Sequence, residues 1–171
     1  MQDPPLGATH YYRGQYGQVT SNQKVGIFLD FENSERNGLG MPLPKGVGVV
    51  RVYKRDHTGA LQFFGEDLID HTPRNEDLPI KMGEAFDVVG DRRQMDHTVI
   101  SGCISKSTWQ IDLRNHKDED VEVVLVEPVG GDWRILSSKR SFEKTDAWTF
   151  TLTPQVEAHG EMRVEYRVRW C

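Results

Sequence analysis

The segment Glu161-Met-Arg-Val-Glu-Tyr-Arg-Val-Arg-Trp170 decides the fold class, because apolar and charged residues alternate along its whole length. A helix would scatter the two kinds of residue around its circumference, whereas an extended chain with a period of two separates them onto opposite faces. The segment therefore predicts a strand with one face on a core and the other in water. The apolar face consists of Met162, Val164, Tyr166, Val168 and Trp170.

The same alternation recurs upstream, between short stretches rich in glycine, proline, asparagine and aspartate. We expect roughly ten to thirteen strands at a spacing of about 8–12 residues and no helix, which is typical of an antiparallel β-sandwich of the immunoglobulin or fibronectin kind. The predicted strands include residues 25–31, 47–55, 61–64, 67–72, 78–82, 86–90, 99–104, 109–113, 121–126, 133–137, 148–152 and 161–170.

A chain of 171 residues is long enough for one ordinary domain or two small ones. Residues 1–23 are polar and rich in glycine and tyrosine, so we interpret them as an N-terminal arm or an irregular first strand. Residues 24–171 form the predicted sandwich. They could also divide into two fused layers, residues 24–106 and residues 107–171.

The formal net charge of −5 gives no electrostatic reason to bind nucleic acid or anionic lipid. Arg163, Arg167 and Arg169 share one face of the last strand, and we interpret that face as solvated and balanced by nearby carboxylates. No window of about 18 apolar residues predicts a transmembrane segment. The first five residues lack the basic and apolar regions of a signal peptide, so none is expected.

The chain has two cysteines, Cys103 and Cys171, which are too few for a disulfide framework. We expect two unpaired thiols, with the terminal Cys171 exposed and able to form an intermolecular bond. An intramolecular bridge is the less favoured alternative.

The sequence predicts no catalytic, metal or cofactor site. Asp67 and His71 share a strand face while Asp70 points away, so only two ligands converge where a closed site needs three or four. The acidic run 118–120 is typical of a solvated turn. There is no Gly-x-Ser-x-Gly nucleophile motif and no phosphate-binding loop that ends in Gly-Lys-Ser/Thr.

We interpret the tryptophans mainly as residues of the hydrophobic core. Trp109, Trp148 and Trp170 fall on the apolar phase of their strands and are expected in the core. Trp133 follows a Gly-Gly turn, where capping the core is favoured over stacking on a sugar.

Candidate partner contacts fall in two segments and at the terminus. Apolar residues interleave with proline and glycine over residues 39–44, where they either tuck under the domain or meet a partner. The tyrosine-rich N-terminal segment could add a strand to a neighbouring subunit. The candidates are Leu39, Met41, Leu43, Tyr11, Tyr12, Tyr16 and Cys171.

From Phe31 to Val168 the chain resembles the bacterial domain of unknown function 4139 family, the C-terminal domain of mucoidy-inhibitor-like proteins. The segments that carry the resemblance are Phe31-Glu-Asn-Ser-Glu-Arg-Asn-Gly-Leu-Gly-Met-Pro-Leu-Pro-Lys-Gly46, Val50-Arg-Val-Tyr-Lys-Arg55, Phe64-Gly-Glu-Asp67, Ile69-Asp-His-Thr-Pro73, Gly83-Glu-Ala-Phe-Asp-Val-Val89, Leu113-Arg-Asn-His-Lys-Asp118, Val126-Glu-Pro128, Gly131-Asp-Trp133 and Tyr166-Arg-Val168.

The resemblance implies an all-β domain of envelope-associated proteins, without catalytic residues and with an extracytoplasmic or cell-envelope location. These 171 residues contain neither the front domain nor the coiled coil of that layout, so we expect the chain to be either a fragment or a stand-alone version. The predicted function is a non-enzymatic module for protein–protein interaction or envelope assembly, which could bind a partner protein or form a homo-oligomer or filament. The alternative is a carbohydrate-binding or hydrolytic domain.

Overall fold

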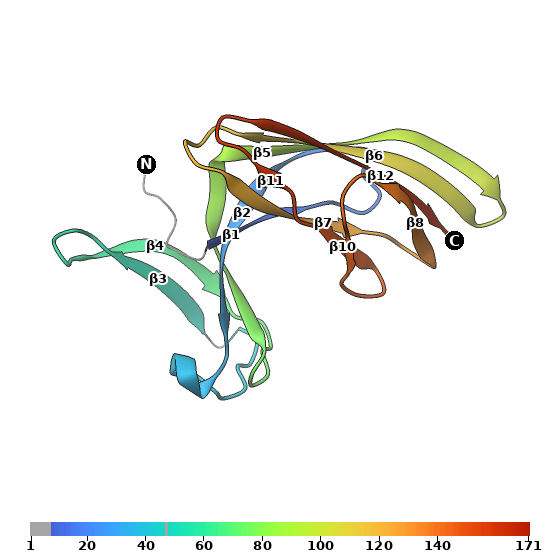
Figure 1. The fold of residues 1–171 in the computed structure, drawn as a ribbon. Helices are drawn as coiled ribbons and strands as arrows, with labels where there is room; N and C mark the ends of the chain where they lie inside the picture. The colour runs from blue at the N-terminus through green and yellow to red at the C-terminus, as the bar shows by residue number, and fades with distance from the viewer. Residues whose placement is uncertain (1–7, 47) are drawn as a thin grey trace. The chain divides into compact units, whose positions relative to one another are not determined.

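The computed structural model describes residues 8–46 and 48–171, and nearly all of their regular structure is β-strand (Figure 1). These residues contain one short 3-10 turn, η1 (Glu35–Asn37), and no α-helix, so the all-β prediction is confirmed. The twelve strands, within the expected range, are β1 (Ala8–Arg13), β2 (Thr20–Glu32), β3 (Val49–Arg55), β4 (Leu61–Leu68), β5 (Asp77–Ser101), β6 (Ile104–Asn115), β7 (Val121–Pro128), β8 (Trp133–Ser138), β9 (Glu143–Lys144), β10 (Thr149–Leu152), β11 (Gln155–Val156) and β12 (Glu161–Trp170).

The chain divides into two compact units. The smaller unit contains Gly26–Glu84, and the larger contains His10–Val25 and Ala85–Cys171. The boundary at residues 106 and 107, which we considered from sequence, lies inside the paired β5–β6 hairpin of the larger unit. Residues 1–7 of the segment interpreted as an arm or irregular first strand lie outside the described residues, and its residues 8–23 contain β1 and the start of β2, both in the main sheet.

Ten strands form one sheet in the order β8-β12-β6-β5-β2-β1-β7-β10-β9, with β11 on β7. The sheet is mixed, because β1 runs parallel to β7, with His10 opposite Val123 and Arg13 opposite Val126. The prediction of a purely antiparallel arrangement is therefore wrong. Alternation within a strand reports which residues face the core but carries no information on the direction of its partner.

The core of the larger unit lies between distant parts of the same sheet. The Phe150 ring on β10 lies 5.1 Å from that of Tyr166 on β12 and 5.5 Å from that of Trp133 on β8. The sheet therefore curls until strands from its two ends face each other, and the alternating residues of β6, β7 and β12 fill the interior. Its fully or nearly fully buried members include Tyr12, Val88, Ile111, Leu113, Val123, Leu125, Phe150, Leu152, Val164, Tyr166 and Val168.

The smaller unit holds the predicted β3–β4 hairpin, in which Val49 pairs with Leu68 and Arg55 with Leu61. Its second strand was predicted to end at residue 64, but β4 continues to Leu68, into the separate strand predicted at residues 67–72. Gly65 lies against the carbonyl of Met82 on β5, where a Cβ atom would clash with the backbone. Asn33 is fully buried and donates to the carbonyls of Met41, Thr72 and Pro73 at 2.8–3.2 Å. This one side chain thus ties together loops that have little regular structure of their own.

The longest strand, β5, joins the predicted strands 78–82 and 86–90 with the first part of the predicted strand 99–104, whose remainder is the β5–β6 turn and the start of β6. The polar run 91–97 and the Gly83-Glu84 pair were interpreted as interruptions, but β5 passes through both and turns only after Ser101. Two bulges, at Gln94/Asp96 and at Val99/Ser101, absorb the irregular pattern. Trp148, predicted in the core, is exposed because β10 begins one residue later, at Thr149.

The two cysteines form a disulfide between the β5–β6 turn and the residue after β12, with 4.8 Å between the Cα atoms of Cys103 and Cys171. The prediction of two unpaired thiols, and of Cys171 as a reactive terminal thiol, is therefore wrong. β6 and β12 pair along their full length, from Glu161 opposite Arg114 to Trp170 opposite Ser105. That register, which sequence spacing does not reveal, brings the two cysteines together.

Candidate functional site

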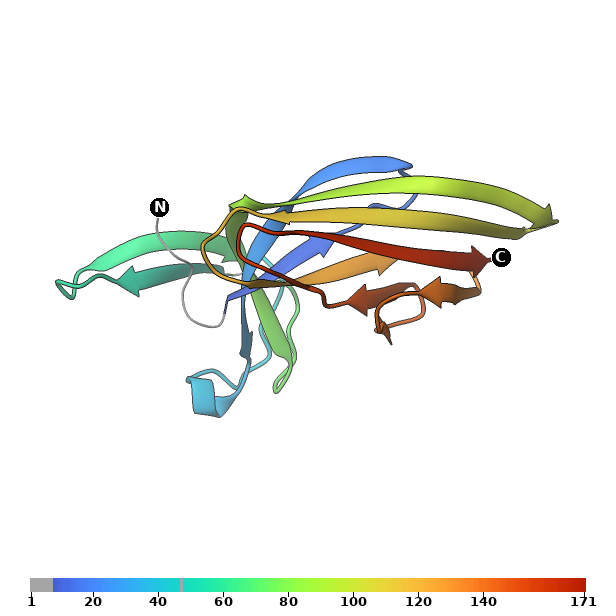
Figure 2. The same ribbon diagram turned by 45° about the horizontal axis from the view of Figure 1, so that its top comes forward.

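The larger unit contains an open pocket of about 180 Å³ on the inner face of its curled sheet. The β1–β2 turn forms one wall, and the segment that follows β7 forms another. Strands β5, β6 and β12 supply the floor, and Figure 2 shows these three strands side by side. The lining residues are Tyr16, Gly17, Gln18, Val19, Arg92, Gln94, Trp109, Pro128, Val129, Gly130, Tyr166, Val168 and Trp170.

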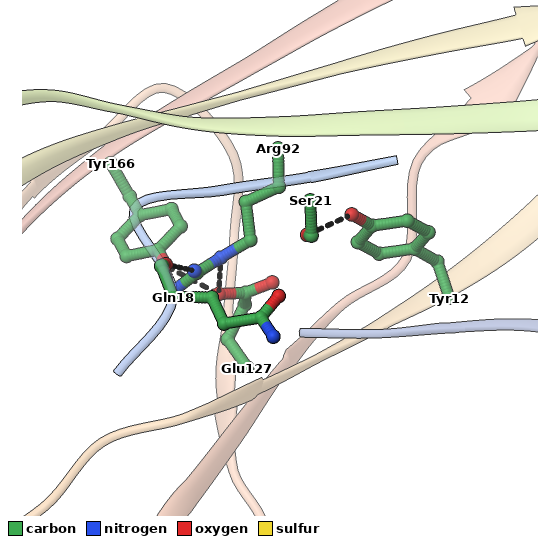
Figure 3. Close-up of polar contacts among 6 residues, drawn as sticks. All are labelled: Tyr12, Gln18, Ser21, Arg92, Glu127 and Tyr166. Carbon is green, nitrogen blue, oxygen red and sulfur yellow. Dashed lines mark hydrogen bonds and ion pairs between the residues drawn. The ribbon is translucent and has the colours of Figure 1, made fainter. Parts of the chain in front are cut away.

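Arg92 of the pocket floor forms a buried ion pair with Glu127 on β7 (Figure 3). Arg92 donates from Nε to Glu127 Oε2 at 2.8 Å and from Nη1 to the carbonyl of Gln18 at 3.1 Å. The Tyr166 hydroxyl donates to the same Glu127 oxygen at 2.5 Å. The Arg92 guanidinium also lies 3.4 Å from the centre of the Trp109 ring, a close cation–π contact.

Burial and pairing act in opposite directions on the charges of this cluster. Burial raises the pKa of the Glu127 carboxyl, and the positive charge of Arg92 opposes that shift. The pKa of Tyr166 lies well above its ordinary value because the hydroxyl is buried beside the carboxylate. The cluster neutralises itself, so we assign it a structural role: it fixes the β1–β2 turn over the sheet.

One carboxylate oxygen of this cluster is unsatisfied. Glu127 Oε1 is buried without a hydrogen-bond partner, and it faces the position that a Cβ atom of Gly14 would occupy, 2.6 Å away. A glycine is therefore needed at residue 14 to admit the carboxylate.

A second polar cluster lies beside Trp170. Ser107 Oγ accepts from Gln94 Nε2 at 2.7 Å and lies 2.9 Å from His97 Nδ1. This serine–histidine pair joins neighbouring strands, so it is not part of a local sequence motif. The Ser107 side chain is fully buried, so a substrate cannot reach its hydroxyl.

The walls of the pocket are mainly apolar. Tyr16, 70% exposed, lies so close to Gly130 that a Cβ atom there would be 2.6 Å from the tyrosine hydroxyl. The Trp170 ring closes another side and lies 5.7 Å from the His97 ring. The only side-chain amides on the lining are those of Gln18 and Gln94. The composition suits an apolar side chain better than a heavily hydroxylated ligand.

An open strand edge adjoins the pocket. The backbone amide of Gln94 donates to the backbone carbonyl of Val19 at 2.7 Å, and β2 begins at Thr20. Beyond this point β5 continues through residues 95–101 with β6 on one side, and every one of these residues is exposed. β2, the neighbour of β5 on the other side, runs from Thr20, beside Gln94, to Glu32, beside Glu76, so residues 95–101 lie past its end. It therefore presents unpaired backbone groups next to the pocket.

The residues predicted as partner contacts do not gather in one place. Tyr12 is fully buried and bonds Ser21, so its ring is unavailable to a partner, whereas Tyr16 lines the pocket. Tyr11 is half-buried on β1, which pairs with β7 of the same chain.

The other predicted contacts lie in the smaller unit and at the terminus. Met41 is 73% exposed, and Leu39 and Leu43 are half-buried. Leu43 pairs with Thr72 through backbone bonds in both directions. Cys171 is exposed but bonded to Cys103.

The carboxylates considered as metal ligands have other partners. Asp70 pairs with Lys45 at 3.4 Å, and Asp118 lies 2.9 Å from His159. Across residues 8–46 and 48–171, no three acidic, histidine or cysteine side chains are grouped closely enough to hold a metal ion.

Comparisons with protein-family models, with curated proteins and with solved structures give no match. In the part of the chain that the structure describes, no helix has the length and apolar character needed to cross a membrane.

Proposed function

We propose that this chain is a non-enzymatic β-sandwich module, immunoglobulin- or fibronectin-like, that binds an extended segment of a partner protein by strand addition. The partner strand pairs with residues 95–101 of β5, on the same side of β5 as β2, and places one apolar side chain in the pocket. The partner can be another protein or a second copy of this chain.

The observation that carries this proposal is the adjacency of the open edge and the pocket. Strand addition needs unpaired main-chain groups for affinity and a pocket for an alternate side chain for specificity. Gln94 belongs to both, since its backbone amide bonds the carbonyl of Val19 in the β1–β2 turn and the residue lines the pocket.

The chemistry of the pocket supports binding rather than catalysis. Arg92 and Tyr166 of its lining are already bonded to the buried Glu127, and the nearby Ser107 hydroxyl is covered. A general acid or base must reach a substrate proton, and none of these groups has that access.

The disulfide supports the proposed extracytoplasmic or cell-envelope setting, because such bonds persist mainly in oxidising compartments. The resemblance to the bacterial family named above points to the same setting. Envelope assembly is accordingly the process in which we place the module.

A carbohydrate-binding function is the second candidate, favoured by the exposed Tyr16 and the half-buried Trp170 at the rim of the pocket. Aromatic rings stack on sugars, but a sugar also needs several hydrogen-bonding groups. The sparse amides of this pocket favour the peptide.

The test is selection of a phage-displayed random peptide library on the immobilised protein. The selected sequence is then synthesised and titrated by tryptophan fluorescence. We expect extended peptides with apolar residues at alternate positions, and slower hydrogen exchange of the backbone amides of residues 95–101 on binding.

Two variants and a control locate the site. Val19→Asp places a charge at the mouth of the pocket, and Val99→Lys places one on the open edge, so each should weaken peptide binding about tenfold or more. Leu61→Asp changes a residue as exposed as Val19, at 59%, in the β3–β4 hairpin and should leave binding unchanged. Peptides that bind all three variants equally would refute the proposal, and a response to glycans instead of peptides would favour the second candidate.

A further inference from the structure

The outer face of the sheet, opposite the pocket, carries three cations in one cross-strand row. Arg169 on β12 lies directly opposite Lys106 on β6 and, on its other side, opposite Arg134 on β8. We call these residues the basic row. Side chains that face each other across neighbouring strands have Cβ atoms about 5 Å apart, and like charges in that arrangement destabilise the sheet.

The cations of the basic row have no side-chain partner, unlike two arginines on the same face. Arg163 donates to Asp112 at 2.8 Å, and Arg167 donates to Thr108 Oγ1 at 3.0 Å. No ion pair or side-chain hydrogen bond among the described residues includes a member of the basic row. The expectation that carboxylates balance this face therefore holds for Arg163 but not for Arg169.

The nearest acidic residues by register flank the basic row without entering it. Asp132 pairs with Cys171, two residues past Arg169, and Asp96 pairs with Thr108, two residues past Lys106. Neither carboxylate lies within ion-pair distance of a row member. Three positive charges therefore meet, although the chain as a whole carries a net charge of −5.

The disulfide constrains the backbone beside two of the three cations. Cys171 follows Arg169 by two residues and Cys103 precedes Lys106 by three, so the covalent bond closes the end of the sheet beside the row. Arg169 and Lys106 are also only half-exposed, which limits the freedom of their side chains. A site whose groups are fixed before binding loses less entropy when a ligand arrives.

We propose that the basic row is a binding site for phosphate-type oxyanions. It spans about 10 Å across three strands, since neighbouring strands lie about 4.8 Å apart. A multivalent phosphate laid along it would contact all three cations and remove their mutual repulsion. The phosphate can be free or the headgroup of a lipid, and this site is independent of the partner strand proposed for the opposite face.

The test is a titration of the full chain with tripolyphosphate by isothermal calorimetry at low ionic strength. Arg169→Gln and Lys106→Gln should each weaken binding about fivefold, the factor that one basic residue typically contributes near an anionic surface. Arg163→Gln is the matched control, because it removes an arginine of the same strand and face that already has a partner, and its affinity should equal that of the unaltered chain.

A second readout separates this site from general charge attraction. Without phosphate at low salt, Arg169→Gln should melt at a higher temperature than the unaltered chain, because both repulsions in the row disappear. Arg163→Gln should melt at a lower temperature. Tripolyphosphate should raise the melting temperature of the unaltered chain and of Arg163→Gln much more than that of Arg169→Gln.

Vesicles distinguish the two sources of phosphate. Flotation with phosphatidylglycerol vesicles, but not with phosphatidylcholine alone, that is lost in Arg169→Gln would identify a lipid headgroup. Tripolyphosphate binding without flotation would identify a soluble phosphate. Equal tripolyphosphate affinity in Arg169→Gln, Arg163→Gln and the unaltered chain would overturn the proposal, as would absence of binding to either probe.

Discussion

Reduction of the Cys103–Cys171 disulfide should lower the free energy of unfolding by about 4 kcal/mol. The two cysteines are 68 residues apart, and a cross-link of that span removes much of the conformational freedom of the unfolded chain. The folded chain should keep its geometry, because the backbones of Asp132 and Cys171 bond each other in both directions at 3.0 Å without help from the sulfur atoms. The loss therefore arises mainly in the unfolded state.

The assay is urea unfolding followed by tryptophan fluorescence, with and without a reductant. The double variant Cys103→Ser/Cys171→Ser should unfold at the midpoint of the reduced protein and should not respond to reductant. A difference below about 1 kcal/mol between the oxidised and reduced protein would refute the chain-entropy reasoning. Labelling of the unfolded, unreduced protein by a maleimide would refute the disulfide itself.

Three further predictions concern buried polar groups. Glu127→Gln should destabilise the protein by about 3–5 kcal/mol, because it leaves the Arg92 charge buried without a counter-ion, whereas Glu122→Gln, on the exposed face of the same strand, should have little effect on urea unfolding. Burial lowers the pKa of His10 to about 4, so the unfolded chain binds more protons than the folded one between pH 4 and 6.5. Stability should therefore be full above pH 6.5 and fall as the pH drops towards 4, by about 2 kcal/mol after allowance for partial solvation, and His10→Gln should flatten that dependence. Asn33→Ala should cost about 3 kcal/mol, measured by urea unfolding, because it leaves three carbonyls and one amide without their partner; Asn33→Asp should cost at least as much, since a carboxylate would repel those carbonyls.

The sequence predicted the all-β class and several individual strands, because half-buried strands leave a simple pattern. The last strand, Glu161–Trp170, matches its predicted bounds, with Val164, Tyr166 and Val168 buried. The β3–β4 hairpin was also predicted, since glycine and aspartate mark its turn and Asp56 accepts three hydrogen bonds there.

The candidate site was not predictable in the same way. Its residues come from segments far apart in the chain, and their proximity depends on the register of β5, β6 and β12. Gln94 and His97 lie in a polar run that we interpreted as an interruption, and bulges in β5 turn them towards Ser107. Arg92 and Glu127 pair across 35 residues, and neither shows any local sign of burial.

The parallel pair of β1 and β7 has a consequence for synthesis of the chain on the ribosome. His10 emerges more than a hundred residues before its partner Val123, and β10, which covers the other side of β7, emerges later still. One side of β1 must therefore remain unpaired while the residues between it and β7 are made. Pairing over such a separation slows folding, so we expect the larger unit to complete only after β7 and β10 have emerged, with that side of β1 exposed to chaperones until then.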